Sequence, residues 1–599
     1  MTTATAIQES DLNQAAGPRV LLFFLQRLLF RRSYEFIEPL GLMTLAAYIE
    51  ERGYRPGVFS GTVTEGAALL EREMERRLVA AVGLYCDFEN RSVVEPFCRW
   101  IKDRWGLPVV VGGPQAVALH EDFLSQSGCD AVAIGEGEAT LQELLDCLIR
   151  GQGALGDIDG IAYLDDHGCL VRTPERRLIA HLDELPYPRM AHSLTGVKNN
   201  LSILSGRGCP FQCAFCYEGG KQVRLRSVDH VMGEIRHGLR ENPHVRYIWF
   251  ADDTFTLQRE RTAHFCRELA ELRKEYDFVW FCEGHPSTLV RSPGLIDEMV
   301  EAGLARMQIG IETGSARLMD TYNKRTTPEQ IEAVVRRCRD AGLKQLCGNI
   351  IIGGAHETDE SLAETWAYVD KLLTLAPGML DISLTLFMPF PETAITRCPK
   401  QFGMTVLDGE ALTSVGDYPV AHTEAMDLPA IAMARKDFQL KVLHRMRELL
   451  AQGRVSHQAI LDHYRLHAVY GISSVWHETI YAKQPFLHRR YTMLARTSAR
   501  TSAEIPPGEW TRWRPQRVFS LWNAIAWEKG YPEVLGEVLS PLEYHLLLHC
   551  SGKLQVGQLT GVALEQFPGR YDSREEAEAL IQKVLRSFEE KHWLVFHPD

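Results

Sequence analysis

The sequence predicts an α/β protein with two successive parallel β-sheets followed by a helical C-terminal region. Short apolar runs alternate with amphipathic segments from about residue 19 to 150, and a second such series begins at about residue 200. The chain from about 425 to 535 has a helical pattern instead. The 599 residues, 45% of them hydrophobic and 24% charged, suit a globular protein of several domains. We expect domains at residues 1–190, 191–424, 425–535 and 536–599.

The first series predicts strands at residues 19–25, 55–61, 78–86, 107–113 and 130–138, with helices such as 39–53 and 92–106 between them. This alternation, with glycines at the strand ends, is typical of a doubly wound, Rossmann-like parallel sheet. Such sheets bind ligands at the carboxyl ends of their strands. The candidate binding residues after the third, fourth and fifth strands are Asp87, Glu89, Asn90, Gly112, Gly113, Pro114, Gly135, Glu136, Gly137 and Glu138. Glycines there allow a large ligand to approach the backbone, although turn formation alone would also explain them.

The second series predicts a partial (β/α)6 barrel of the TIM type. Its strands are expected at residues 200–206, 246–252, 278–284, 305–312, 344–354 and 380–389, after a connector that ends at 182–190. The functional site of such a barrel lies at the carboxyl ends of its strands. The last part of the chain predicts short helices that end in a strand, a pattern similar to a small winged-helix unit.

Three cysteines, Cys209, Cys213 and Cys216, form a CxxxCxxC cluster directly after the first barrel strand. Three close cysteines without a nearby fourth favour a four-iron, four-sulfur cluster whose last iron is open to a substrate. A zinc site is the alternative, but it requires a fourth ligand, and no His stands near the loop to supply one.

With Phe215 in the aromatic position, this cluster resembles the CxxxCxΦC hallmark of the radical S-adenosylmethionine (radical SAM) superfamily. In that superfamily the open iron binds S-adenosylmethionine, and electron transfer gives a 5'-deoxyadenosyl radical. The resemblance implies an S-adenosylmethionine site formed by Phe215, Asp252, Asp253, Glu283, His285, Glu312, Gly353 and Gly354. His285 stands where relatives often carry Arg. Lys324 is typical of these enzymes, but it would equally suit a cap or a solvated residue before the next helix.

Residues 19–400 together resemble the cobalamin-binding radical SAM enzymes, on the segments "EPLGLMTLAAYIEERGY", "VVVGGPQA" and "AIGEGEATLQELL". The resemblance implies that the glycine loops of the first sheet bind cobalamin, with the "CDFENRS" loop below the corrin. The DxHxxG signature that supplies a histidine to cobalt is absent. A cobalamin without a protein histidine ligand is therefore expected, and some relatives keep the domain without the cofactor.

The two implied cofactors favour a C-methyltransferase that acts on an unactivated carbon of a natural-product or cofactor-type substrate. The implied route uses a 5'-deoxyadenosyl radical and methylcobalamin. The main alternative is a cobalamin-binding radical SAM cyclase or rearrangement enzyme without methyl transfer. A sensor that binds DNA through the winged-helix-like end is disfavoured, because acidic residues outnumber basic ones in the last 59 residues.

The expected partners are a small-molecule or peptide substrate and an electron donor such as flavodoxin or ferredoxin. The net charge of −13 argues against nucleic acid as a partner. No long uncharged apolar run and no signal-peptide pattern is present, so a cytoplasmic protein without a membrane segment is expected. The winged-helix-like end could hold a peptide substrate or serve only in packing.

Overall fold

The computed structural model describes residues 17–26, 39–76, 78–87, 90–118, 120–196, 199–217, 220–407, 418–506, 508–521, 524–528 and 531–598. The chain divides into two compact units. The first comprises Met1–Ala376 and Ile382–Val442, and the second comprises Pro377–Asp381 and Leu443–Asp599. Both regions predicted to bind cofactors belong to the first unit. Within the described ranges, no helix has the length and apolar character needed to cross a bilayer.

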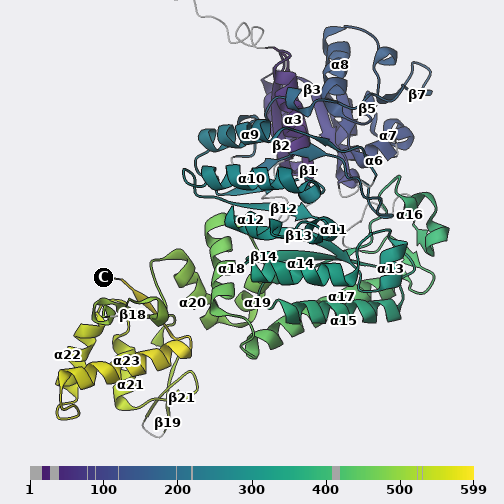
Figure 1. The fold of residues 1–599 in the computed structure, drawn as a ribbon. Helices are drawn as coiled ribbons and strands as arrows, with labels where there is room; N and C mark the ends of the chain where they lie inside the picture. The colour runs from purple at the N-terminus through teal and green to yellow at the C-terminus, as the bar shows by residue number, and fades with distance from the viewer. Residues whose placement is uncertain are drawn as a thin grey trace, which may run out of the picture. The chain divides into compact units, whose positions relative to one another are not determined.

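The first sheet has seven strands in the order β2-β1-β3-β4-β5-β6-β7 (Figure 1). They are β1 (Arg19–Gln26), β2 (Arg55–Thr62), β3 (Val79–Tyr85), β4 (Val109–Gly112), β5 (Ala131–Ala133), β6 (Ile161–Leu164) and β7 (Leu170–Arg172). The first five are parallel, which confirms the predicted doubly wound sheet. Strands β6 and β7 extend it as an antiparallel edge, an addition that the sequence reasoning missed. The strand order reverses at β1 and β3, where such sheets bind ligands.

Helices cover both faces of this sheet, and alternate residues of β1 face the two opposite cores. Leu21, Phe23 and Leu25 of β1 pack in one core, with residues of α4, α5 and α7. Val20 and Leu22 pack in the other, with residues of α3 and α8. The helices of this region are α3 (Leu40–Glu50), α4 (Val63–Glu75), α5 (Arg91–Trp105), α6 (Pro114–Ala118), α7 (His120–Ser127) and α8 (Gly137–Arg150).

The second sheet has six strands in the order β15-β14-β13-β12-β11-β8. They are β8 (Asn200–Ile203), β11 (Tyr247–Phe250), β12 (Val279–Gly284), β13 (Leu304–Glu312), β14 (Gln345–Ile352) and β15 (Leu380–Leu386). The pairs from β8 to β14 are parallel, and the sheet follows chain order, as expected for the predicted partial barrel. A strand order without reversal brings the carboxyl ends of all these strands to one rim.

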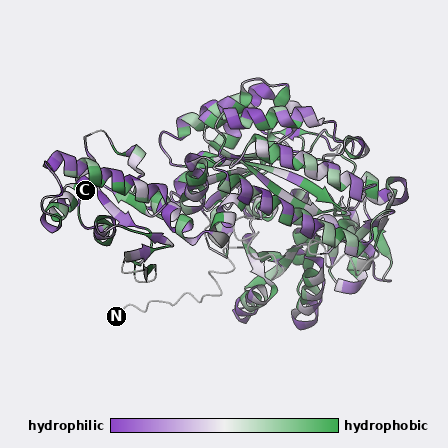
Figure 2. Ribbon diagram, turned by 90° about the horizontal axis from the view of Figure 1, so that it is seen from below, coloured by the Kyte–Doolittle hydropathy of each residue, from purple (hydrophilic) through white to green (hydrophobic). Residues whose placement is uncertain are grey.

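Helices alternate with these strands along the chain. They are α9 (Val228–Glu241), α10 (Arg259–Leu272), α11 (Pro286–Val290), α12 (Leu295–Glu301), α13 (Ala316–Thr321), α14 (Pro328–Asp340), α15 (Asp359–Leu375), α16 (Ala394–Arg397) and α17 (Leu428–Ala451). The start of α14 is fixed locally by a capping box between Thr327 and Gln330. In Figure 2 the helices carry both hydrophilic and hydrophobic residues, as expected for helices with one buried face. A short hairpin, β16 (Met404–Val406) and β17 (Ala421–Thr423), also belongs to this unit.

The second unit is helical at first and mixed at its end. Its helices are α18 (His457–Tyr470), α19 (Val475–Lys483), α20 (Pro485–Arg496), α21 (Pro541–His549), α22 (Val556–Gln566) and α23 (Arg574–Glu590). Its strands are β18 (Arg514–Arg517), β19 (Ile525–Glu528), β20 (Tyr531–Val534), β21 (Glu537–Val538) and β22 (Leu594–His597). The predicted short helices before a final strand are present, and β22 pairs with β18. The helical pattern expected over 425–535 ends at α20, because strands β18 to β20 follow it.

Candidate functional site

The predicted iron–sulfur cysteines lie on one loop that follows β8. The loop joins β9 (Gly206–Arg207) to β10 (Arg224–Leu225), which pair as antiparallel strands. Cys209, Cys213 and Cys216 all stand on this loop, and none of the three is in a disulfide. The fold therefore places them at the rim of the barrel where ligands bind.

The three thiols suit a four-iron cluster better than a single ion. Among the described residues, no three His, Cys, Asp or Glu side chains are grouped so that they could hold one metal ion. The cysteines of a four-iron cluster each bind a different iron, so their sulfurs need not converge on one point. Burial raises the pKa of the Cys213 thiol, and the nearby Lys324 ammonium opposes this by favouring the thiolate. The donor set thus fits a cluster with one iron left for another ligand.

A buried ion pair lies beside the cysteine loop. Lys324 Nζ donates a hydrogen bond to Glu312 Oε1 at 2.8 Å, and the two residues are only 7% and 6% exposed. Glu312 ends β13 with a φ of 65°, in the left-handed region. Thr327, not Lys324, caps the following helix. Lys324 therefore lies at this site, whereas the sequence had also allowed a capping role. No local pattern predicts its pairing with Glu312, which lies on another element.

The two aspartates after β11 have different environments. Asp252 is buried and accepts hydrogen bonds from the backbone N–H of Ser205 at 3.0 Å and from its hydroxyl at 2.6 Å. Asp253 lines the large cavity described below. Asp252 therefore braces the start of the cysteine-bearing segment, whereas Asp253 lies on the wall of the cavity, and its contact with a ligand stays a prediction.

The end of β12 carries an acidic group and a neutral imidazole. Burial, and after it the charge of Asp253, raises the pKa of Glu283 to about 7. Gln308 Nε2 donates to Glu283 Oε1 at 3.1 Å. Burial, and after it the Lys324 ammonium, lowers the pKa of His285 to about 3. His285 is thus neutral near pH 7 and does not supply the positive charge that relatives place there as Arg.

His285 also has a local structural role. Its ring stacks on Phe211 of the cysteine loop, with centroids 3.7 Å apart and planes 9° from parallel. Its Nδ1 accepts a hydrogen bond from the Ser287 N–H and so caps α11. The imidazole therefore links the end of β12 to the cysteine loop by stacking.

Phe215 and the glycines after β14 pack against protein side chains. Phe215 contacts Tyr322 edge to face, at a centroid distance of 5.4 Å. A Cβ on Gly354 would lie 1.9 Å from the Tyr322 hydroxyl, and one on Gly353 would lie 2.6 Å from the Ile431 side chain. These contacts explain the glycines without a ligand, so their expected approach to S-adenosylmethionine stays a prediction.

A cavity of about 1250 Å³ is lined both by the first sheet and by the barrel. This volume exceeds the roughly 300–1,000 Å³ of ordinary small-molecule pockets, and it suits a large ligand such as a corrin. The predicted cobalamin-binding residues on its wall are Gly112, Gly113, Pro114, Gly135, Glu136, Gly137 and Glu138. From the barrel, Gly206–Gly208, Tyr217 and Asp253 complete it. The fold therefore brings both predicted ligand-binding regions to one cavity.

The loop after β3 contributes differently. The Asn90 side chain donates to the carbonyls of Leu25 at 3.1 Å and of Tyr85 at 3.0 Å. Asp87 and Asn90 exchange backbone-to-side-chain hydrogen bonds, and neither lines the cavity. Glu89 lies outside the described residues. Asn90 thus joins the ends of β1 and β3, and its predicted contact with cobalamin has no support in this geometry.

Gly113 is required by backbone packing. At its φ of 110°, an added Cβ would lie 2.4 Å from the Cys86 carbonyl oxygen, so backbone packing accounts for this glycine and the expected approach of a ligand stays a prediction. We expect Gly113→Ala to lower the free energy of unfolding by about 2–5 kcal/mol, because strain and overpacking add. Gly112→Ala is the matched control, since its Cβ would meet only Ala133 at 3.9 Å. Chemical denaturation that gives equal losses for the two variants would contradict this reading.

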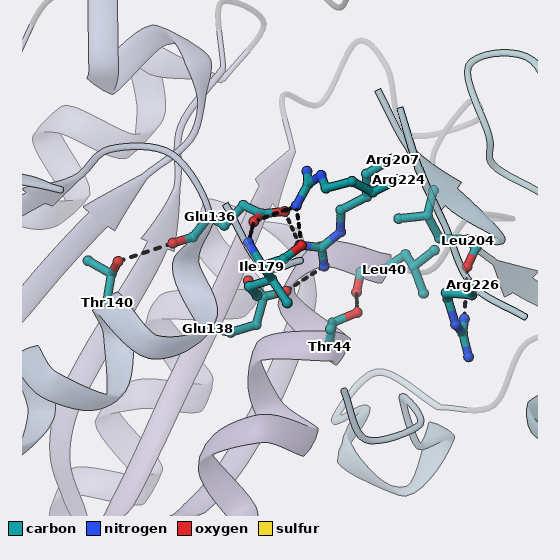
Figure 3. Close-up of polar contacts among 10 residues, drawn as sticks. All are labelled: Leu40, Thr44, Glu136, Glu138, Thr140, Ile179, Leu204, Arg207, Arg224 and Arg226. Atoms are coloured by element: carbon teal, nitrogen blue, oxygen red, sulfur yellow. Dashed lines mark hydrogen bonds and ion pairs between the residues drawn. The ribbon is translucent and has the colours of Figure 1, made fainter. Parts of the chain in front are cut away.

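The carboxylates of Glu136 and Glu138 are engaged by two arginines (Figure 3). Arg207 donates to Glu136 at 2.6 Å and to Glu138 at 2.5 Å, and Arg224 donates to Glu136 at 2.9 Å. The N–H of Ile179 adds a bond to Glu136 at 2.7 Å. These ion pairs account for the two carboxylates without a ligand, and their expected contact with cobalamin stays a prediction. Sequence reasoning missed them because the partners are about 70 to 90 residues apart.

Two family descriptions match the chain in separate regions. The B12 binding domain matches residues 27–145, and the Radical SAM superfamily matches residues 203–369. The first matched region contains β2 to β5 of the first sheet, and the second contains β11 to β14 of the barrel.

Two curated proteins align over much of the chain. An uncharacterized methyltransferase of Pyrococcus horikoshii is 32% identical over 378 residues, which are 60% of this chain and 77% of that protein. The anaerobic magnesium-protoporphyrin IX monomethyl ester cyclase of Rubrivivax gelatinosus is 27% identical over 55% of this chain and 61% of its own length.

A solved structure shares the fold. The radical S-adenosylmethionine methyltransferase TsrM from Kitasatospora setae, solved with cobalamin and a [4Fe-4S] cluster, is 18% identical. The similarity covers 80% of this chain and 99% of that one, with a TM-score of 0.59. Together with the cysteine loop and the shared cavity, these similarities show that the chain belongs to the cobalamin-binding radical S-adenosylmethionine enzymes, whose cofactors are a four-iron cluster, S-adenosylmethionine and cobalamin.

Proposed function

We propose that the protein transfers a methyl group from S-adenosylmethionine to an unactivated carbon of a natural-product or cofactor-type molecule. The observation that carries the proposal is the single cavity walled by Gly112–Pro114 and Gly135–Glu138 of the sheet and by Gly206–Gly208 of the barrel. When bound, the cluster supplies the electron that cleaves S-adenosylmethionine, and the corrin carries the methyl group. A single cavity would hold S-adenosylmethionine and the corrin close to the substrate, so that they need not meet in solution. Such positioning lowers the activation free energy by several kcal/mol.

The residues of the chain bind and orient the reactants. Cys209, Cys213 and Cys216 hold the cluster, and their loop ends at strands that line the cavity. Asp253 and Glu283 stand at the ends of neighbouring strands and present oxygen atoms to the ammonium of S-adenosylmethionine. An external one-electron donor such as flavodoxin or ferredoxin is part of the proposal.

Isotope labelling tests methyl transfer directly. Reconstituted protein is incubated anaerobically with a reductant, with S-adenosylmethionine deuterated in its methyl group, and with candidate substrates supplied from the genomic neighbourhood. We expect the label in the product, and we expect S-adenosylhomocysteine and 5'-deoxyadenosine in comparable amounts, because each turnover consumes two S-adenosylmethionine molecules. Mass spectrometry of the mixture measures all three.

Ring formation or rearrangement is the second candidate, and the similarity to the magnesium-protoporphyrin cyclase favours it. Neither reaction needs a methyl donor. A product that forms with 5'-deoxyadenosine, but without label and without S-adenosylhomocysteine, would reject methyl transfer and support this candidate.

A further inference from the structure

The cysteine loop is closed at its base by two arginines that face each other. Arg207 and Arg224 are cross-strand partners in the β9–β10 ribbon, so the loop leaves one and returns at the other. Like charges directly opposite on paired strands repel and weaken the pair. Since the side chains are only 19% and 11% exposed, water does little to screen this repulsion. The ribbon therefore needs a negative group from elsewhere.

Glu136 supplies that group from the first sheet. One carboxylate accepts from both arginines, and Glu138 adds a second acceptor to Arg207. Glu138 is 4% exposed and Glu136 is 12% exposed, so both pairs are shielded from water. Burial alone would raise the pKa of Glu136, but hydrogen bonds from Arg224 and Arg207 outweigh it and hold that pKa below its usual value. The carboxylate thus stays ionised and keeps the two arginines together.

The connector segment that contains Ile179 also contacts the Glu136 carboxylate. Ile179 donates its N–H to Glu136, and its carbonyl accepts a bond from Arg224 at 2.7 Å. Glu136 itself is the N-cap position of α8, directly after β5. The ribbon, the connector and the β5–α8 turn therefore meet at one residue, as Figure 3 shows.

The partners belong to the two cofactor-binding elements. Glu136 and Glu138 stand in the turn that lines the cavity from the sheet, and Arg207 lies two positions before Cys209 on the barrel side. We propose that Glu136 and Glu138 are positioning residues that clamp the cysteine loop to the corrin-binding edge of the sheet. The clamp sets the separation of cluster and corrin. This inference rests on the proposed function only in its consequence for turnover, since the clamp itself can be measured without a substrate.

Hydrogen exchange of the reconstituted full-length protein tests the clamp. In Glu136→Gln, the amides of residues 206–225 should exchange about tenfold faster than in the wild type, because the ribbon loses the acceptor that opposes its repulsion. Iron and bound hydroxocobalamin should remain near wild-type levels, since the carboxylate contacts arginines. Glu138→Gln removes only one acceptor from Arg207 and should give a smaller change in the same segment, which keeps the test usable if the first variant folds poorly.

The matched control is Glu143→Gln, which removes a carboxylate of the same helix that pairs with Arg176 and not with the barrel. It should leave residues 206–225 unchanged. A second readout is the electron paramagnetic resonance of the reduced cluster, whose relaxation by cob(II)alamin should become weaker and more heterogeneous in Glu136→Gln. Unchanged exchange in residues 206–225, a loss of corrin from Glu136→Gln, or faster exchange throughout both Glu136→Gln and the control would each overturn the proposal. If the wild type transfers no methyl group, the proposed function is rejected. The hydrogen-exchange and electron paramagnetic resonance results would still test the role of Glu136 and Glu138.

Discussion

Replacement of Cys209, Cys213 and Cys216 by Ala is expected to abolish the cluster and all cleavage of S-adenosylmethionine. The three thiols stand on one loop at the rim of the barrel, and each supplies one of the three iron ligands of the proposed site. The iron content of anaerobically purified protein, its visible absorption and the yield of 5'-deoxyadenosine measure the loss. We expect all three to fall to background while the circular dichroism spectrum persists, because the helices and strands that give this spectrum lie outside the segment between β9 and β10.

Two exposed cysteines provide the control. Cys169→Ala and Cys398→Ala remove thiols that lie outside the cysteine loop. Both variants should keep the brown colour and the cleavage activity of the wild type. Iron and 5'-deoxyadenosine that survive in the triple variant would show that the cluster is held elsewhere.

Lys324→Met is expected to lower the free energy of unfolding by about 3–5 kcal/mol, because it leaves the Glu312 carboxylate buried without its partner. The double variant Glu312→Gln with Lys324→Met should recover much of this loss, since no uncompensated charge then remains. Chemical denaturation of the wild type, the single variant and the double variant, each as apoprotein under anaerobic conditions, measures the three free energies of unfolding.

An exposed pair gives the matching control. Lys274 and Glu271 form an ion pair in which both side chains are 68% exposed. Lys274→Met should cost less than about 1 kcal/mol, because water screens such pairs. If Lys324→Met lowers the free energy of unfolding no more than Lys274→Met does, then the ion pair between Lys324 and Glu312 does not stabilise the fold.

The sequence was sufficient for features that depend on local spacing. Parallel strands separated by helices follow from the alternation of apolar runs, and both sheets were predicted with strand positions close to those found. The cysteine spacing alone indicated an iron–sulfur site. The antiparallel strands β6 and β7 were not predicted, because no helix separates them and the alternation of strands and helices therefore does not mark them.

The roles of single side chains were predicted less well. Asp252 and Asp253 are neighbours in the sequence, yet one is turned to Ser205 and the other to the cavity. Gly113 lies on the cavity wall, and the carbonyl group of Cys86 occupies the space that a Cβ there would need. The direction of the side chain decides the contacts of each aspartate, and backbone packing decides those of the glycine; a sequence motif contains neither.

The alternation of apolar strands and amphipathic helices was enough to predict the fold class, because strand periodicity is a local property of the chain. The domain bounds and the three cluster cysteines stay predictions from local patterns of the same kind. Three features became visible only in the folded chain: Glu136 pairs with Arg207 and Arg224, Lys324 is buried against Glu312, and the glycine loops share a cavity with the barrel. These contacts join segments that the chain separates widely. Their energies depend on burial and on the direction of approach, which exist only after the sheet and the barrel have packed together.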